Sequence, residues 1–295
     1  MINKFTNSPV FPIVPCYNER QLLDIDATIK YAKYLVKRGA KILMTTSGTT
    51  QFNLLSNAEI KLINECLSKN FPDITIIMGL KAESFLATQA IIKEYNKFNF
   101  NDNTFLMLKY PERYYEDDII ERYFHILAEC SDYPLLIHCG PLVHGVTGKT
   151  HDYTAELINK ICTHKNIVGI KEETSDLILA YDVVQDINIG IGVVCAGRSQ
   201  RRFNMLEDAA HGQMTFLAGV GSLFPKLDIY WNSVAEDRLF KVFFKYGWHP
   251  SLRYALQYLK SIPLHDRQPW PCLAGTGMYQ DIENVVNEIK GMICF

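Results

Sequence analysis

The sequence predicts an α/β fold, a (β/α)8 TIM barrel followed by a C-terminal helical extension. Eight short apolar segments alternate with amphipathic helical segments over residues 1–236, which is the count for a closed barrel. The apolar segments are mostly continuous, as in parallel strands that are covered on both faces. An open doubly wound sheet would need a glycine-rich turn after the first strand, and VPCYNER (14–20) contains no glycine.

The predicted strands and helices alternate along this part of the chain. The strands are 9–15, 41–47, 74–80, 104–110, 134–140, 167–173, 191–197 and 215–221. The helices are 22–40, 57–70, 83–98, 117–130, 153–162, 175–185, 201–210 and 225–236. Ser56 and Glu59 have the spacing of a capping box at the start of the second helix. Gly39 fits the end of the first helix.

The remaining residues, 237–295, are predicted to be mostly helical. Three helical segments occur there, DRLFKVFFKYG, PSLRYALQYLKSI and DIENVVNEIKGMI. Pro263, Pro269, Pro271 and Gly275 separate the last two. We therefore expect two regions: a barrel over 1–236, and a helical extension over 237–295 that packs on the barrel and is not an independent domain.

Composition and charge limit the classes of partner and the cellular location that we expect for this protein. The net charge of −2, from 30 basic and 32 acidic residues, does not indicate a nucleic acid or an anionic membrane as partner. The eight cysteines form no CxxC pair, which favours reduced thiols over a disulfide framework or a zinc site. The chain has no signal-peptide pattern and no apolar run long enough to span a membrane, so we expect a cytoplasmic protein.

The functional prediction depends mainly on Lys171. Catalytic groups of such barrels lie at the C-terminal ends of the strands, and the segment NIVGIKEE is apolar up to this lysine. Burial in a dry barrel mouth disfavours the ammonium and favours the neutral amine, which can attack a ketone to form an imine. The alternative is an ordinary strand-end lysine that pairs with Glu172 or Glu173.

The loop SGTT (47–50) after the second predicted strand is a candidate binding site for a carboxylate. The hydroxyls of Thr49 and Thr50 and the backbone N–H groups after Gly48 suit such a group. A 2-oxo acid carries a carboxylate beside its ketone, so this loop and Lys171 fit one ligand. The alternative is an ordinary turn whose hydroxyls cap a helix.

Together these segments resemble the dihydrodipicolinate synthase / N-acetylneuraminate lyase family of pyruvate-dependent class I aldolases over about residues 8–225. SGTTQFNLLSNAE (47–59) is similar to the family's Gly-Thr-Thr-Gly-Glu loop, and NIVGIKEETSD (166–176) to its strand with the Schiff-base lysine. CAG (195–197) and FLAGVGSLFP (216–225) look like the ends of its last two strands. The resemblance implies that Lys171 is the nucleophile, that Thr49 and Thr50 hold the oxo acid, and that Gly197 leaves room for it.

The departures from the family concern the groups around the lysine. His138 in PLLIHCGP stands where the family has a tyrosine that shuttles protons. An imidazole can perform acid–base chemistry near neutral pH, so His138 is the predicted acid–base group. The alternative is a packed histidine in a site that has lost its shuttle. The loop continues with Gln51 and Phe52 where the family has Gly-Glu. PLVHGVTG (141–148) lacks the arginine that dihydrodipicolinate synthases use for a second carboxylate, which argues against that activity.

The end of the fourth predicted strand, KYPERYYEDD (109–118), provides further candidates. The family often has a tyrosine pair after this strand, near a subunit interface, and Tyr110 is the candidate substrate-binding residue here. Lys109 either faces an acidic substrate or pairs with Glu112.

The resemblance implies a Schiff-base-forming lyase or aldolase that makes or breaks a C–C bond of pyruvate or a related 2-oxo acid. An aldehyde is the expected second substrate, and no metal or organic cofactor is expected because the lysine supplies the electron sink. The alternatives are a non-catalytic member that binds a 2-oxo acid, and a sugar-acid dehydratase of the same family. Family members are usually oligomeric, often tetrameric, so we expect a homo-oligomer.

Overall fold

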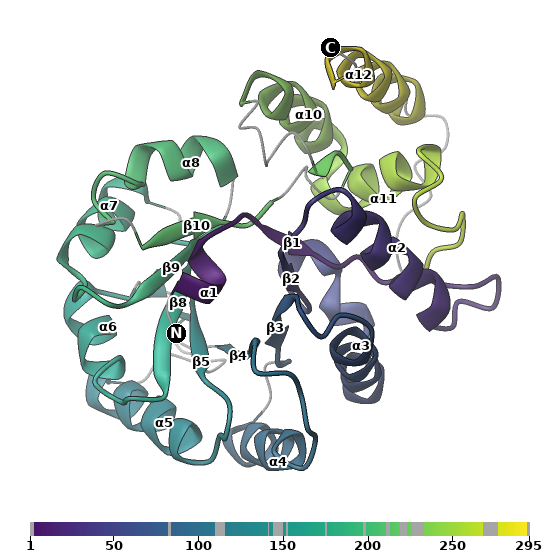
Figure 1. Cartoon of the computed structure of the whole chain (residues 1–295). Coiled ribbons are helices and arrows are strands. Elements are labelled where there is room, and N and C mark those ends of the chain that lie inside the picture. Colours follow the sequence, from purple (N-terminus) through teal and green to yellow (C-terminus); the bar gives the residue numbers. More distant parts are fainter. Residues whose placement is uncertain are drawn as a thin grey trace.

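The eight predicted strands form one parallel sheet that curves into a barrel (Figure 1). The computed structural model describes residues 3–81, 84–109, 116–140, 142–143, 150–151, 153–174, 176–196, 199–210, 213–218, 223–225, 233–267 and 277–293. The strands are β1 (Val10–Pro12), β2 (Ile42–Met44), β3 (Thr75–Gly79), β4 (Thr104–Lys109), β5 (Leu135–Cys139), β8 (Ile167–Glu172), β9 (Gly192–Cys195) and β10 (Met214–Phe216). β10 meets β1 through a parallel bridge between Val10 and Leu217, and Ala218 N–H donates to the Val10 carbonyl at 2.7 Å. The predicted TIM barrel is confirmed.

Helices follow the strands and cover the outside of the barrel (Figure 1). They are α2 (Ile25–Lys37), α3 (Asn57–Asn70), α4 (Phe85–Tyr95), α5 (Asp117–Glu129), α6 (Ala155–Ile161), α7 (Leu177–Asp186) and α8 (Ser199–Leu206). The predicted capping box of α3 is present: the Ser56 side chain accepts from Glu59 N–H, and the Glu59 carboxylate accepts from Ser56 N–H. The predicted helix 225–236 lies largely outside the described residues.

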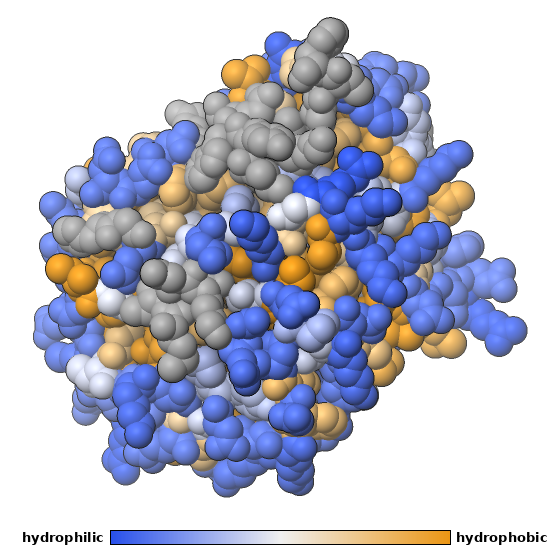
Figure 2. Space-filling view, in the orientation of Figure 1, coloured by the Kyte–Doolittle hydropathy of each residue, from blue (hydrophilic) through white to orange (hydrophobic). Residues whose placement is uncertain are grey.

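A short helix that the sequence did not predict, α1 (Asn3–Thr6), closes one end of the barrel (Figure 1). Its Phe5 is fully buried and belongs to the apolar cluster inside the barrel, which also contains Met107, Leu136 and Val194. Its ring meets Phe105 edge-on, with the ring centroids 5.1 Å apart. This aromatic plug lies at the end of the barrel where the strands begin. The face of the molecule on this side is covered mainly by hydrophilic side chains (Figure 2).

Three C-terminal helices, α10 (Ser233–Tyr246), α11 (Trp248–Tyr258) and α12 (Met278–Ile293), pack together beside the barrel (Figure 1). Arginines tie this layer to the loops of the barrel. Arg253 of α11 donates to the Pro15 carbonyl after β1 at 2.8 Å. Arg267 donates to the Leu54 carbonyl at 2.7 Å and pairs with Glu59 at the same distance. The extension thus helps to fix the segments that follow β1 and β2.

Two further strands, β6 (Leu142–Val143) and β7 (Thr150–His151), form a small antiparallel ladder after β5 that the sequence did not predict. In the part of the chain that the structure describes, no helix combines the length and the apolar character needed to cross a bilayer.

Candidate active site

The strand β8 directs Lys171 into the barrel. Lys171 pairs in register with His138 on β5 and with Val194 on β9, and Val194 belongs to the apolar cluster inside the barrel. Register partners in a parallel sheet point to the same face, so the Lys171 side chain points inward. It is 1% exposed. Since Lys171 is the second-last residue of its strand, the amine lies toward the C-terminal mouth of the barrel.

Three polar groups meet at this amine. The Lys171 Nζ lies 3.0 Å from His138 Nε2. Both groups also contact the same carboxylate oxygen, Oε2 of Glu173, which lies 2.5 Å from the imidazole nitrogen and forms a close ion pair with the amine. The inward lysine and the ion pair were alternatives in the sequence analysis, and the structure has both.

The electrostatics of these groups follow from burial and mutual charge. Burial and the neighbouring Lys171 lower the pKa of His138 to about 4, although Glu173 opposes this shift. The imidazole is therefore neutral near pH 7. Burial alone would raise the pKa of Glu173, but Lys171 and His138 hold it well below its ordinary value. The carboxylate therefore stays charged.

A second lysine, Lys109, lies in the same row of register partners as His138 and Lys171. It is the last residue of β4 and pairs in register with His138. Its Nζ lies over the ring of Phe52, 3.1 Å from the centroid, which is a cation–π contact. Burial and Lys171 lower the pKa of Lys109 to about 7, with Glu173 acting in the opposite direction. Glu112, the partner that the sequence suggested, lies outside the described residues.

The predicted carboxylate-binding loop forms a short 3-10 turn, η1 (Gly48–Thr50). Gln51 ends it in the left-handed region at φ 53°, and its N–H donates to the Gly48 carbonyl at 3.0 Å. The Nε2 of His249, on α11, also lies 2.8 Å from that carbonyl oxygen. The C-terminal extension therefore contacts the loop directly. Thr49 is partly exposed, whereas the side chain of Thr50 and all of Tyr110 and Gly197 lie outside the described residues.

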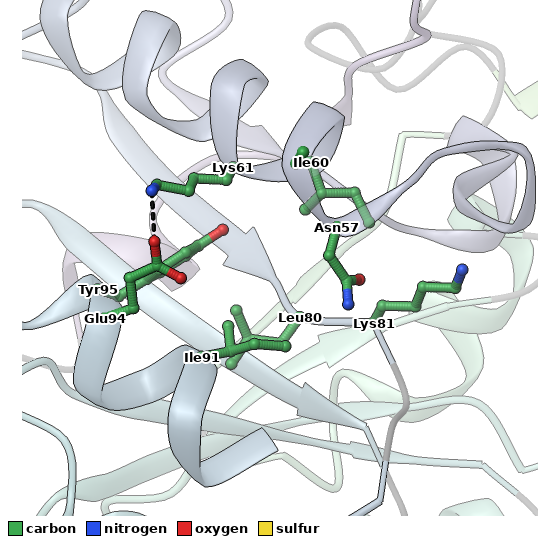
Figure 3. Close-up of a pocket in the computed structure, with 9 residues that line it drawn as sticks. Asn57, Ile60, Lys61, Leu80, Lys81, Ile91, Glu94 and Tyr95 are labelled. Atoms are coloured by element: carbon green, nitrogen blue, oxygen red, sulfur yellow. Dashed lines mark hydrogen bonds and ion pairs between the residues drawn. The ribbon is translucent and has the colours of Figure 1, made fainter. Parts of the chain in front are cut away.

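A pocket of about 240 Å³ lies between the start of α3 and the helix α4 (Figure 3). Asn57 and Lys81 border one side of it, and Lys61 pairs with Glu94 on the other (Figure 3). None of the lysine–histidine row lines this pocket, so it is separate from the candidate site. Among the described residues, no group of three or more histidine, cysteine or acidic side chains is placed to hold a metal ion.

Comparison with known proteins identifies the family. The model of the dihydrodipicolinate synthetase family matches residues 4–222. The chain belongs to this family. This confirms the resemblance to the pyruvate-dependent class I aldolases that the sequence indicated.

Relatives in the dihydrodipicolinate synthetase family are distant in sequence. An uncharacterized DapA-like lyase of Pyrococcus furiosus is 24% identical over 57% of this chain and 54% of its own length. A 4-hydroxy-tetrahydrodipicolinate synthase of Pseudomonas syringae is 25% identical over 68% of this chain and 63% of its own. The chain thus matches less than two thirds of the length of these relatives.

Solved structures of the family have the same fold. The Escherichia coli K12 prophage protein YagE, in complex with pyruvate, superposes with a TM-score of 0.81 at 16% identity, over 97% of this chain and 99% of its own. The sialic acid aldolase of Ruminococcus gnavus superposes with a TM-score of 0.82 at 13% identity, over 98% of both chains. At such identities the likeness shows the fold and not the substrate.

The sequence did not predict the role of His249 or the contact between Lys109 and Phe52, and it indicated only part of the role of Glu173. Glu173 was considered only as a pairing partner for a lysine, but it contacts Lys171 and His138 together. His249 was missed because it lies 201 residues from the Gly48 carbonyl that it contacts. The contact between Lys109 and Phe52 was missed because neither residue type predicts a partner so far away in sequence.

Proposed function

We propose that this protein is a Schiff-base-forming lyase or aldolase that makes or breaks a C–C bond of pyruvate or a related 2-oxo acid. The observation that carries the proposal is the Lys171 amine, 1% exposed in the barrel mouth and 3.0 Å from an imidazole. A buried amine beside a group that can accept a proton is the arrangement required of an imine-forming nucleophile.

The lysine performs the covalent step. Lys171 first gives a proton from its ammonium to the neighbouring His138–Glu173 pair, and the freed Nζ attacks the ketone carbon. The ketone oxygen leaves as water after it takes up two protons, one from the attacking nitrogen and one returned by that pair. The resulting iminium withdraws electrons from the adjacent carbon, so a C–C bond there can form with an aldehyde or break to release one. Hydrolysis of the iminium returns the oxo acid and the free amine.

His138 and Glu173 handle the protons in this scheme. The Nε2 of His138 faces both the amine and the Glu173 carboxylate. A neutral imidazole accepts a hydrogen bond there in one tautomer and donates one in the other. His138 is therefore the proposed proton carrier in place of the family's tyrosine. The negative charge of Glu173 stabilises each cation that forms during the reaction, whether iminium or imidazolium.

The loop Gly48–Thr50 is the proposed site for the carboxylate of the oxo acid, through the backbone N–H groups and hydroxyls of Thr49 and Thr50. The contact of His249 with the Gly48 carbonyl supports this role, because it anchors the start of the loop from a separate helix. We also propose that Tyr110 and Gly197 line the substrate site, and that the protein forms a homo-oligomer. Analytical ultracentrifugation tests the oligomer.

The experiment is reductive trapping followed by a turnover assay. The protein is incubated with pyruvate and borohydride and its intact mass is measured, for the wild type, for Lys171→Ala and for Lys165→Ala. Lys165 is an exposed lysine two residues before β8 and serves as the control. We expect one reduced pyruvyl group in the wild type and in Lys165→Ala, and none in Lys171→Ala.

Turnover then distinguishes the alternatives. Release of an aldehyde from a cleaved substrate, or consumption of one with pyruvate, supports the aldolase or lyase. Trapping without turnover over a panel of aldehydes and sugar acids favours the binding-only alternative, and loss of water from a sugar acid favours a dehydratase. No adduct in the wild type overturns the proposal.

A further inference from the structure

The barrel mouth contains a second buried amine that the proposed imine chemistry does not use. Lys109, His138 and Lys171 are register partners on the adjacent strands β4, β5 and β8. Met107, two residues before Lys109, belongs to the apolar cluster inside the barrel, so Lys109 points inward as well. It is 8% exposed. This row of register partners therefore directs two amines into the mouth of the barrel.

The charges of this space are unbalanced among the described residues. The carboxylate of Glu173 forms an ion pair with Lys171. Within the part of the chain that the structure describes, Lys109 forms no hydrogen bond or ion pair, and its ammonium rests on the face of Phe52. A ring face compensates only part of the cost of burying a cation. The groups that act on Lys109 electrostatically are Lys171, Glu173 and His138. With Lys109 protonated, Lys171 charged as ammonium or iminium and His138 neutral, the four groups together carry one excess positive charge.

The position of Lys109 separates it from the reacting carbons. Its Cα lies two strands from that of Lys171, a spacing of roughly 10 Å in a parallel sheet. The carboxylate of a 2-oxo acid is bonded directly to the ketone carbon and must stay close to the imine. An acidic group further along the substrate can extend toward β4 and Phe52. Phe52 belongs to the 3-10 turn η2 (Phe52–Leu54), which directly follows the Gly48–Thr50 loop.

We propose that Lys109 binds a second acidic group of the substrate, a carboxylate distal to the ketone, and so selects 2-oxo diacids or adducts that carry such a group. This inference rests on the proposed function, because the ketone must react at Lys171. The second carboxylate would then be bound at the end of β4. The segment after β5 offers no arginine for this role, since none occurs in 141–148. The bound carboxylate completes the charge balance of the mouth.

The test compares two oxo acids of equal chain length, 2-oxoglutarate with a distal carboxylate and 2-oxopentanoate without one. Borohydride trapping at pH 6.5 gives the half-saturating concentration of each. We expect the wild type to favour 2-oxoglutarate by about tenfold or more, as for one hydrogen-bonded ion pair in a partly buried site. Lys109→Met removes the preference, because it raises the half-saturating concentration of 2-oxoglutarate far more than that of 2-oxopentanoate. Lys109→Arg retains part of the preference because it keeps the charge.

A dependence on pH provides a second readout. Because the pKa of Lys109 is about 7 in the free protein, the preference should fall as pH rises above 7, when the amine loses its proton. An equal effect of Lys109→Met on both oxo acids overturns the distal assignment. The assignment is also overturned if the wild type shows no preference and Glu112→Gln creates a preference for 2-oxoglutarate. That result would mean that Glu112 is the partner of Lys109. If neither oxo acid is trapped by the wild type, the proposed imine function fails first.

Discussion

The amine of Lys171 and the imidazole of His138 face each other across two neighbouring strands, with Nζ and Nε2 3.0 Å apart. The pairing of β5 with β8 fixes this relationship, since the two residues are register partners near the ends of their strands. A shift of either strand by one residue would turn one of the two side chains away from the barrel interior.

Replacing His138 should separate adduct formation from turnover. We expect His138→Gln to lower kcat by about 10²–10⁴-fold, the usual contribution of an acid–base group. The imine can still be trapped, because Lys171 keeps its place and its Glu173 partner. Steady-state kinetics and intact mass on the same sample measure both. His125→Gln, on the outer helix α5, is the control and should leave kcat unchanged. An unchanged kcat in His138→Gln would refute the assignment.

Lys109 should reduce stability below neutral pH. Its pKa of about 7 lies below the ordinary 10.5, so between these values the unfolded chain holds a proton that the folded protein lacks. Stability from this group therefore rises with pH over that window, and the full cost of burying the charge is present below pH 7. We expect Lys109→Met to stabilise the protein at pH 6 by about 2 kcal/mol or more.

Urea unfolding at pH 6, 8 and 10 measures this effect. The gain from Lys109→Met should shrink as pH approaches 10. Lys93→Met, at an exposed position on α4, is the control and should show no such trend. A gain that is equal at all three pH values would mean that the charge is not its cause.

Phe5 should be important for stability although it lies in a four-residue helix. A Cβ added at Gly169 or Gly192 would come within 2.6 Å or 2.4 Å of the Phe5 ring, so the two glycines make room for it. We expect Phe5→Ala to cost about 3 kcal/mol of unfolding free energy in denaturant titrations. Leu86→Ala on the exposed surface of α4 should cost less than about 0.5 kcal/mol.

The fit of the plug can be tested with a double variant. Gly192→Ala should be destabilising alone and much less so in the Phe5→Ala background, because the ring that it meets is gone. Equal costs in both backgrounds would show that the ring does not fill this space.

Gln51 is held in a conformation that glycine adopts more easily. Its φ is 53°, and neither its amide nitrogen nor its amide oxygen has a hydrogen-bond partner among the described residues, although the side chain is 1% exposed. We expect Gln51→Gly to stabilise the protein by about 1 kcal/mol in urea unfolding, through relief of the left-handed backbone and of the unpaired amide. Asn53→Gly, at an exposed position in η2, should give no gain. A destabilised Gln51→Gly would show that the amide contributes packing that outweighs its strain.

The strands and most helices could be predicted because their signals are local. Continuous apolar runs identify strands covered on both faces, and Ser56 with Glu59 identifies the start of α3. The inward direction of Lys171 follows from its place at the end of such a run. The plug at Phe5 gave no signal, because four residues are too few for a helical pattern to emerge.

The rest of the site depends on contacts between distant segments. His249 reaches Gly48 because α11 packs on the barrel. Lys109, at the end of β4, meets Phe52, in the turn η2 that follows β2, because both lie at the mouth of one curved sheet. The ion pair between Lys171 and Glu173 was only one of two alternatives from sequence. Two residues apart on an extended chain, their side chains lie on the same face, but only the structure shows that both meet the imidazole.

The most direct test of the account is to map the reduced pyruvate adduct to a single residue. The mouth holds two buried amines, so trapping alone does not identify the nucleophile. The trapped protein is digested and its modified peptide is sequenced by mass spectrometry. We expect the pyruvyl group on Lys171, and we expect Lys109→Met to be labelled at the same place. A label on Lys109, or on any lysine outside the barrel mouth, would contradict this assignment.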